Sequence, residues 1–154
     1  MYLGRNYRLK YSADTPKPLM LKNNRWILSE VILETMGILG IQKTFRDFYI
    51  QKGESILAER VKYFAPKVGV KPGAITVREL GYHWASCGRN AALNFHWKTM
   101  LAPMTVIDYI VVHELCHLHH RNHTDAFWNE VDKVLPNYRE RKNWLRSNGA
   151  ALDV

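Results

Sequence analysis

The sequence is poor in cysteine and has no long apolar run. Its two cysteines, Cys87 and Cys116, are too few for a disulfide framework, and we expect both to be free thiols. The longest apolar stretch beyond the N-terminus, residues 106–113, includes Asp108 and is far shorter than the roughly 20 residues that cross a bilayer. Residues 1–10 lack the apolar segment of a secretory signal. These absences exclude a disulfide-stabilised scaffold and a membrane span, and they predict a cytoplasmic protein.

Acidic residues are also scarce relative to basic ones. The chain has 22 Lys and Arg against 14 Asp and Glu, which gives a formal charge of +8. This excess favours encounter with phosphates, nucleic acid or acidic protein surfaces. The basic residues are dispersed along the sequence rather than gathered in one run, which favours a basic, solubilising surface and leaves nucleic-acid binding as the weaker interpretation.

What the sequence does contain is the composition of an ordinary globular protein. Hydrophobic residues make up 47% of the chain and charged residues 23%, which excludes disordered, collagen-like and coiled-coil classes. A chain of 154 residues is long enough to bury a core without disulfides. We therefore expect one domain over residues 1–154.

Two kinds of pattern divide the first half of the chain. Residues 7–12 alternate like a half-buried strand, and residues 19–28 form another strand interrupted at Asn23-Asn24, so we expect an N-terminal hairpin. Residues 30–63 have helical periodicity. Three glycines, Gly37, Gly40 and Gly53, are candidate positions for a break in this segment. We expect two helical pieces.

The second half predicts a loop, two strands and three helices. Proline and glycine between positions 66 and 73 mark the loop. Residues 75–80 and 91–97 have strand patterns, whereas residues 81–88 are too polar and glycine-flanked to extend either strand and should form a loop or sharp turn. The helices should follow the start signals Pro103, Thr124 and Pro136. This order predicts an α+β fold with a small, partly antiparallel sheet packed on one helix and further helices flanking it.

The first of these three helices carries the segment His113-Glu-Leu-Cys-His117, which has the HExxH pattern. A spacing of four residues puts both imidazoles on one helix face, about one turn apart, where they can share one metal ion. Glu114 lies about 100° around the helix from His113, so its carboxylate can reach a water at the metal without taking a coordination position. The pattern predicts a catalytic zinc site with Glu114 as the general base.

A catalytic zinc needs a third protein ligand, and three histidines compete for this role. On a continuous helix, His120 would lie about 10 Å too far along the axis, and His119 points to another side. His123 reaches the metal if the helix ends first, and Asn122 permits this because asparagine tolerates the left-handed conformation. The predicted metal ligands are His113, His117 and His123.

These residues predict hydrolysis. Zinc would lower the pKa of a water toward 7, Glu114 would take its proton, and the hydroxide would attack a carbonyl or phosphoryl group. Three residues stay open as donors to the oxyanion, namely His96, Tyr138 and Arg139.

For four other residues in the second half of the chain, packing explains the side chain better than chemistry does. Cys87 could be a nucleophile or an inhibitory thiolate ligand, but packing of a small neutral side chain is the commoner role for it. Core packing is expected for Cys116, Trp128 and Trp144.

Longer stretches of sequence carry a resemblance to a known family. They are Leu3-Gly-Arg-Asn-Tyr-Arg-Leu-Lys10, Trp84-Ala-Ser-Cys87, Leu93-Asn-Phe-His-Trp97, the run from Ala102 to Leu118, and Asn122-His-Thr124 with Phe127-Trp128. With these the chain resembles the YgjP-like metallopeptidase family, which is related to the SprT-like and WLM zincin proteases. The resemblance implies a zincin-like fold, a peptide or protein substrate, Zn²⁺ on the three histidines and Glu114 as the catalytic residue.

The loop at residues 83–87 departs from the family pattern. The family usually has Arg-Trp-Gly-Ser-Cys there, whereas this chain has His83 and Ala85 at the first and third positions. Any role that the arginine has in the family is therefore not assigned to His83. An alanine in place of the glycine also predicts an ordinary backbone conformation at position 85.

Two other functions stay open. One is a metal-dependent nucleoside triphosphate pyrophosphatase, because some members of the family carry a UTP-hydrolysing label and the +8 charge suits a phosphate substrate. Against it, the sequence has no glycine-rich phosphate loop and no carboxylate cluster for Mg²⁺. The other is a nucleic-acid-associated module with structural zinc. Structural sites normally have four protein ligands, and HExxH with one more histidine supplies three.

Overall fold

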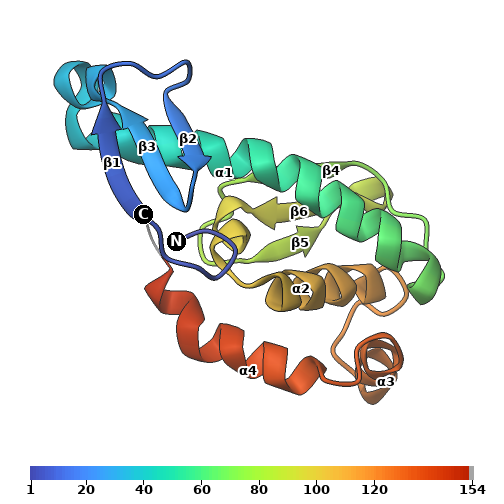
Figure 1. The fold of residues 1–154 in the computed structure, drawn as a ribbon. Helices are drawn as coiled ribbons and strands as arrows, with labels where there is room; N and C mark the ends of the chain where they lie inside the picture. The colour runs from blue at the N-terminus through green and yellow to red at the C-terminus, as the bar shows by residue number, and fades with distance from the viewer. Residues whose placement is uncertain (153–154) are drawn as a thin grey trace.

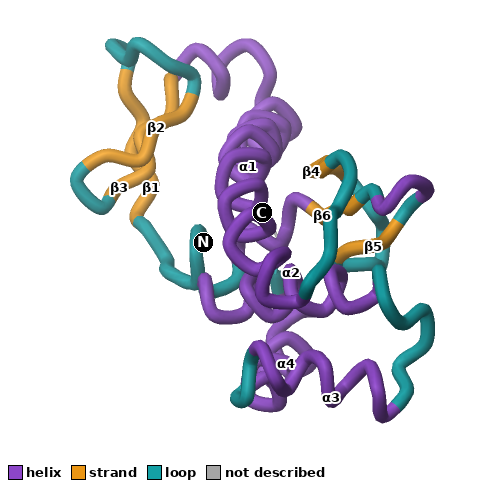
Figure 2. Tube along the Cα trace, turned by 90° about the vertical axis from the view of Figure 1, so that its right-hand side faces the viewer, coloured by secondary structure: helices purple, strands orange, loops and turns teal. Residues whose placement is uncertain are grey.

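A computed structural model describes residues 1–152 as two small sheets joined by one long helix. Figure 2 shows the long helix α1 with one sheet on either side of it. The shorter helices α2, α3 and α4 follow the second sheet and form the lower part of the molecule in Figure 1. The elements of the first sheet are β1 (Arg8–Ser12), β2 (Leu19–Lys22) and β3 (Arg25–Ser29).

The first sheet has the strand order β1-β3-β2. Strands β2 and β3 form the predicted hairpin, and both residues of its turn, Asn23 and Asn24, have positive φ angles of 51° and 57°. Asparagine tolerates this conformation, which a two-residue hairpin turn requires. Strand β1 joins on the other side of β3 and runs parallel to it, so it is not an arm of the hairpin.

Helix α1 (Glu30–Val68) has the one break that divides it into two pieces, as the sequence predicts. The break is at Gly37, whose φ of 60° and ψ of −155° belong to a backbone region that only glycine adopts readily. The other two glycines, Gly40 and Gly53, stay helical. A Cβ at Gly53 would lie 3.2 Å from the side chain of Val77, so this glycine lets the helix approach the second sheet closely.

The C-terminal end of α1 extends farther than predicted. The predicted loop from position 66 was wrong at its start, because Pro66 lies inside the last turn of the helix. The helix ends at Gly69, which has a left-handed φ of 81° and donates its N–H to the carbonyl of Ala65. Proline costs the helix one backbone hydrogen bond, and so close to the end the remaining bonds still form.

The second sheet has the order β4-β6-β5, with β4 parallel and β5 antiparallel to β6. Its strands are β4 (Ile75–Arg78), β5 (Ala85–Cys87) and β6 (Leu93–His96). The prediction of a loop throughout residues 81–88 was therefore wrong, since three residues of it pair along the edge of β6. A strand of three residues is too short for an alternating pattern to reveal. Ala85 has an ordinary negative φ, as predicted.

Short 3₁₀ turns flank β6, and the three C-terminal helices follow. The turns are η1 (Arg89–Ala91) and η2 (Trp97–Leu101), which shorten the strand predicted over 91–97 at both ends. The helices are α2 (Met104–His117), α3 (Asp125–Val134) and α4 (Tyr138–Asn148), with a last turn η3 (Gly149–Ala151). The start signals are confirmed, because Pro103 directly precedes α2 and the Thr124 hydroxyl accepts the N–H of Phe127 at the start of α3.

Helix α2 is the buried centre of the fold. The side chains of Ile107, Val111 and Leu115 are completely buried in the core. Arg60 of α1 holds Asp108 of α2 by two hydrogen bonds of 2.6 and 3.0 Å, which fixes the two helices against each other. Within residues 1–152, no helix is both long and apolar enough to cross a membrane. The predicted α+β fold around this helix is confirmed.

Candidate metal centre

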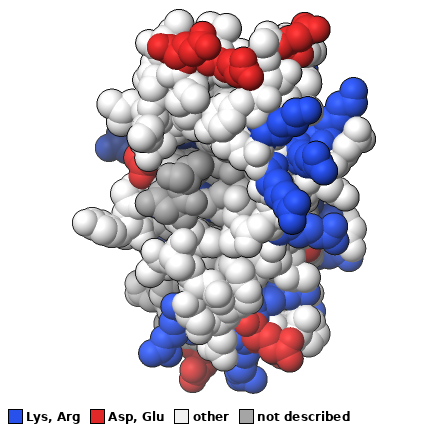
Figure 3. Space-filling view, turned by 60° about the vertical axis from the view of Figure 1, so that its left-hand side comes forward, with Lys and Arg blue, Asp and Glu red and all other residues white. Residues whose placement is uncertain are grey.

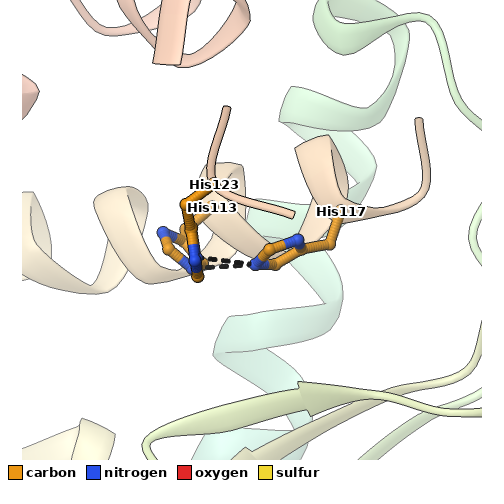
Figure 4. A group of neighbouring side chains, drawn as sticks. All are labelled: His113, His117 and His123. Atoms are coloured by element: carbon orange, nitrogen blue, oxygen red, sulfur yellow. Dashed lines mark hydrogen bonds between the residues drawn. The ribbon is translucent and has the colours of Figure 1, made fainter. Parts of the chain in front are cut away.

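The last turn of α2 and the loop after it bring three imidazoles together. His113 and His117 lie on one face of α2, and His123 faces them from the loop before α3 (Figure 4). The Nε2 atom of His117 lies 3.1 Å from Nε2 of His113 and 3.1 Å from Nε2 of His123, and the third side of this triangle is 3.0 Å. These are the three histidines that the sequence predicts as ligands.

The chain reaches this arrangement because α2 ends at His117 and the next two histidines turn away. The carboxylate of Glu130 on α3 forms a hydrogen bond with each of them. Oε1 lies 2.6 Å from Nδ1 of His119, and Oε2 lies 2.7 Å from Nε2 of His120. Asn122 does not have the left-handed conformation from which we predicted the chain reversal, so that reason was wrong. The reversal is instead stabilised by α3, because Glu130 on that helix holds His119 and His120.

Hydrogen bonds orient two of the three rings. The Nδ1–H of His117 donates to the carbonyl of His120 at 2.9 Å, which leaves a lone pair on Nε2. The hydroxyl oxygen of Tyr109 lies 3.3 Å from Nδ1 of His113. By accepting the Nδ1–H of that ring, it leaves the lone pair of His113 on Nε2 as well. Sequence reasoning missed Tyr109, although its place four residues before His113 on one helix face was a signal for it.

Burial favours the neutral form of two of the imidazoles, His113 and His123. It lowers the pKa of His113 to about 3, with smaller contributions from His117 and His123. The pKa of His123 is also lowered, first by burial and then by His117 and Lys142. Neutral imidazole is the form that binds a metal.

The donor set fits zinc. Two nitrogens bound tetrahedrally to one zinc at 2.0–2.1 Å are about 3.3 Å apart, close to the spacing of the three Nε2 atoms. Three lone pairs that face one another at about 3 Å repel unless a cation lies between them. The group His113, His117 and His123 has three ligand atoms within 4.8 Å of one another, so it can hold a cation.

Glu114 lies beside this group in a buried position. Only 6% of the residue is exposed, and burial raises the pKa of its carboxyl group. The thiol of Cys87 on β5 donates a hydrogen bond of 3.3 Å to Oε2 of Glu114. Burial, and then Glu114, raises the pKa of Cys87 to about 12, so the sulfur stays a protonated donor. The contact gives Cys87 a specific partner in place of the packing role expected for it.

A cleft of about 1260 Å³ opens over the histidines and Glu114. Its walls come from the loop after α1, from β5 and the turn η1 after it, and from the loop after α2. Apart from the proposed site itself, the polar lining residues include three cations and no carboxylate; the cations are Lys71, Arg89 and Arg121. All three cations are exposed, and none has an ion pair within residues 1–152.

The three candidate oxyanion donors do not line this cleft. His96 is 2% exposed and donates its Nε2–H to Glu79, because its Nδ1 accepts the N–H of Lys98. Tyr138 is buried and stacks on Trp128, and Arg139 lies over the ring of Tyr138.

Aromatic rings form a wall behind the three histidines. The ring centre of Phe127 lies 4.6 to 5.0 Å from the ring centres of all three imidazoles. Trp128 stacks on His123 with ring centres 5.6 Å apart. Trp128 is half-buried, so it supports the site as well as packing on the core. Cys116 and Trp144 pack on the core as predicted.

Comparison with known proteins points to one family. A family model described as "YgjP-like, metallopeptidase domain" matches residues 1–148. Among solved structures, the metallopeptidase zymogen abylysin of Pyrococcus abyssi is similar, with a TM-score of 0.55 and 21% sequence identity over 60% of this chain and 93% of that chain. No curated protein matches the chain. The structural likeness shows a shared, zincin-like fold.

Proposed function

The chain belongs to the YgjP-like metallopeptidase family, and from this premise we propose that it is a zinc-dependent peptidase. The proposed zinc ligands are the Nε2 atoms of His113, His117 and His123. The proposed general base is Glu114. The observation that carries the proposal is the convergence of three imidazoles beside a buried carboxylate, at the wall of a cleft large enough for a peptide segment.

When bound, zinc would supply Lewis acidity, which lowers the pKa of water toward 7 and polarises the carbonyl of the peptide bond. Glu114 accepts the proton of the attacking water and then gives it to the leaving amine. Cys87 donates its hydrogen bond to Oε2, and no residue among 1–152 donates to Oε1, so Oε1 is available to take the proton. Burial raises the pKa of this carboxyl group, which makes it a stronger base than an exposed glutamate.

A structural role for the metal has less support. Structural zinc sites normally have four protein ligands, and within residues 1–152 the group contains three. Cys87 would be the natural fourth ligand, but its sulfur is engaged by Glu114. The arrangement leaves a coordination position for a substrate.

The experiment that tests this proposal compares the zinc-loaded protein with its Glu114→Gln variant. Both are incubated with a mixed peptide library and with a panel of nucleoside triphosphates, and products are identified by mass spectrometry. We expect the parent to cleave peptides and the variant to keep one zinc while losing about 100-fold or more in rate. Undiminished cleavage by zinc-loaded Glu114→Gln would contradict the assignment of the base. Hydrolysis of nucleotides alone would replace the peptidase by a pyrophosphatase.

The ligand set has its own control within the same stretch of chain. His123→Ala should bind zinc much more weakly than the parent, because it removes one of three donors. His119→Ala should bind zinc nearly as the parent does, because the His119 side chain is not a ligand and His120 keeps its own contact with the Glu130 carboxylate, which supports the reversal. Equal zinc affinities for the parent and His123→Ala would show that the third ligand lies elsewhere.

A further inference from the structure

The outward face of the first sheet gathers four cations from three strands. Arg8 of β1 lies directly opposite Arg25 of β3, and Lys22 of β2 lies opposite Arg25 on its other side. Lys10 is two residues beyond Arg8 and so points to the same side of the sheet. All four side chains are exposed. We name these four residues the basic sheet face.

The other side of the sheet packs on α1, which leaves this face to solvent. Trp26 and Leu28 alternate with the outward residues of β3 and are 2% and 0% exposed. Trp26 packs edge-on against Phe45 and Phe48 of α1, with ring centres 5.2 and 5.0 Å apart. Because side chains alternate along a strand, burial of this side fixes the cations on the opposite one.

No charge within the sheet balances these cations. Strands β1, β2 and β3 contain no Asp or Glu, and none of the four cations has an ion pair within residues 1–152. Like charges directly opposite each other destabilise a sheet. Figure 3 shows a group of Lys and Arg on the right-hand flank of the molecule, while further Lys and Arg lie at the bottom beside Asp and Glu, and Asp and Glu also lie at the top. The face has a cost in stability that a bound anion would relieve.

We propose that the basic sheet face binds nucleic acid through its phosphate backbone. Neighbouring strands lie about 4.8 Å apart and alternate residues of a strand about 6.7 Å apart, so the four cations form a dense grid. A nucleic-acid strand has one negative charge per 3.4 Å or so of its length, a density that ordinary acidic peptides do not sustain. The large apolar residues of this face, Met20 and Ile27, are half-buried, so it has no exposed apolar side chain to insert into a bilayer.

This surface is separate from the metal centre. The cleft begins at Gly69, just after α1, whereas the first sheet packs near Phe48 of the same helix. At 1.5 Å per residue, the 20 or so helical residues between these places span about 30 Å. The proposal therefore does not depend on the proposed peptidase activity, and its test measures binding alone.

The experiment neutralises the whole face at once in the variant Arg8→Gln, Lys10→Gln, Lys22→Gln, Arg25→Gln. Its affinity for a fluorescein-labelled oligonucleotide, single-stranded and as a duplex, is measured by anisotropy between about 50 and 200 mM salt. We expect a loss of about tenfold or more in affinity. The slope of log K against log salt should become less steep by about 3 for the single strand, since each phosphate contact contributes about 0.7.

A matched control removes the same charge from other surfaces. The variant Lys62→Gln, Arg78→Gln, Lys133→Gln, Arg146→Gln replaces four exposed cations without ion pairs on α1, β4, α3 and α4. It should keep the parent's affinity and salt slope. An equal loss in both variants would overturn the proposal, because net charge alone would then explain the binding. So would a loss confined to phosphatidylserine vesicles or to polyglutamate, which are titrated in parallel. Circular dichroism confirms that both variants fold.

Discussion

Two histidines of the candidate metal centre have a partner at Nδ1, on the side of the ring away from the three clustered Nε2 atoms. A backbone carbonyl holds Nδ1 of His117, and the Tyr109 hydroxyl lies against Nδ1 of His113. Such partners select the tautomer and hold the ring in the orientation that a metal requires, so they contribute to affinity without touching the ion. Tyr109 is 5% exposed, and water cannot easily replace its hydroxyl.

The variant Tyr109→Phe tests this contribution. It removes the hydroxyl that lies 3.3 Å from His113 and keeps the buried ring. We expect zinc affinity to fall about 10-fold, at the lower end of the 10–100-fold range for such partners because the contact is long. The measurement is competition for zinc with a chromophoric chelator. Tyr138→Phe is the matched control, because Tyr138 is also buried and its contacts are ring contacts. Equal zinc affinity in Tyr109→Phe and the parent would remove Tyr109 from the site.

Among the elements, β4 and β6 are linked beyond their backbone pairing by one carboxylate. Glu79, just after β4, accepts hydrogen bonds from Nε1 of Trp97 at 2.9 Å and from Nε2 of His96 at 2.7 Å. The bond from Trp97, followed by the contact with His96, lowers the pKa of Glu79. The second sheet supports β5 and therefore the position of Cys87 against Glu114.

The variant Glu79→Gln should destabilise the protein in a pH-dependent way. The pKa of Glu79 is lower in the folded protein than its usual 4.5, so its charge stabilises the fold above that pH. This stability is lost as the pH falls through the folded pKa. Because the side chain is 56% exposed, solvent screening limits the effect at pH 7 to about 1 kcal/mol or less.

Urea unfolding at neutral and acidic pH measures this difference. The parent should be more stable than Glu79→Gln near pH 7, and the two should converge well below pH 4.5. Glu59→Gln serves as the control, because Glu59 is exposed on α1 and its side chain has no hydrogen bond or ion pair within residues 1–152; it should match the parent at both pH values. A difference that grows on acidification would contradict the assigned direction of the pKa.

At the scale of the whole molecule, positive charge gathers in two places that the sequence does not connect. One is the basic sheet face near the start of α1, and the other is the wall of the cleft beyond its end. In the cleft, Lys71, Arg89 and Arg121 come from three separate loops and turns. If the protein is a peptidase, these unpaired cations favour peptides with acidic side chains.

Peptide kinetics test this preference. A peptide with Glu beside the cleaved bond should have a KM about tenfold lower than its Gln counterpart, since a hydrogen bond to a charged group contributes about 1.5–3 kcal/mol. The variant Lys71→Gln, Arg89→Gln, Arg121→Gln should abolish the difference while leaving kcat for the Gln peptide unchanged. Lys62→Gln, Arg78→Gln, Lys133→Gln is the control with the same charge. Equal KM values for both peptides with the parent protein would refute the preference.

The features that the sequence determined are local. HExxH fixes two imidazoles because helical spacing is set by backbone geometry alone. The start signals at Pro103 and Thr124, and the turn at Asn23-Asn24, depend on residues next to the backbone groups they serve. For the same reason the predicted α+β class and the helix that carries the motif were right.

What only the tertiary structure decided involves residues far apart in the chain. The contact of Cys87 with Glu114 spans 27 positions, and it depends on an edge strand of three residues that no periodic pattern marks. The dispersed basic residues gather because β1 pairs in parallel with β3, which puts Arg8 opposite Arg25. Strand pairing and its register depend on which faces the whole core buries, so a count of charges along the sequence could not reveal that surface.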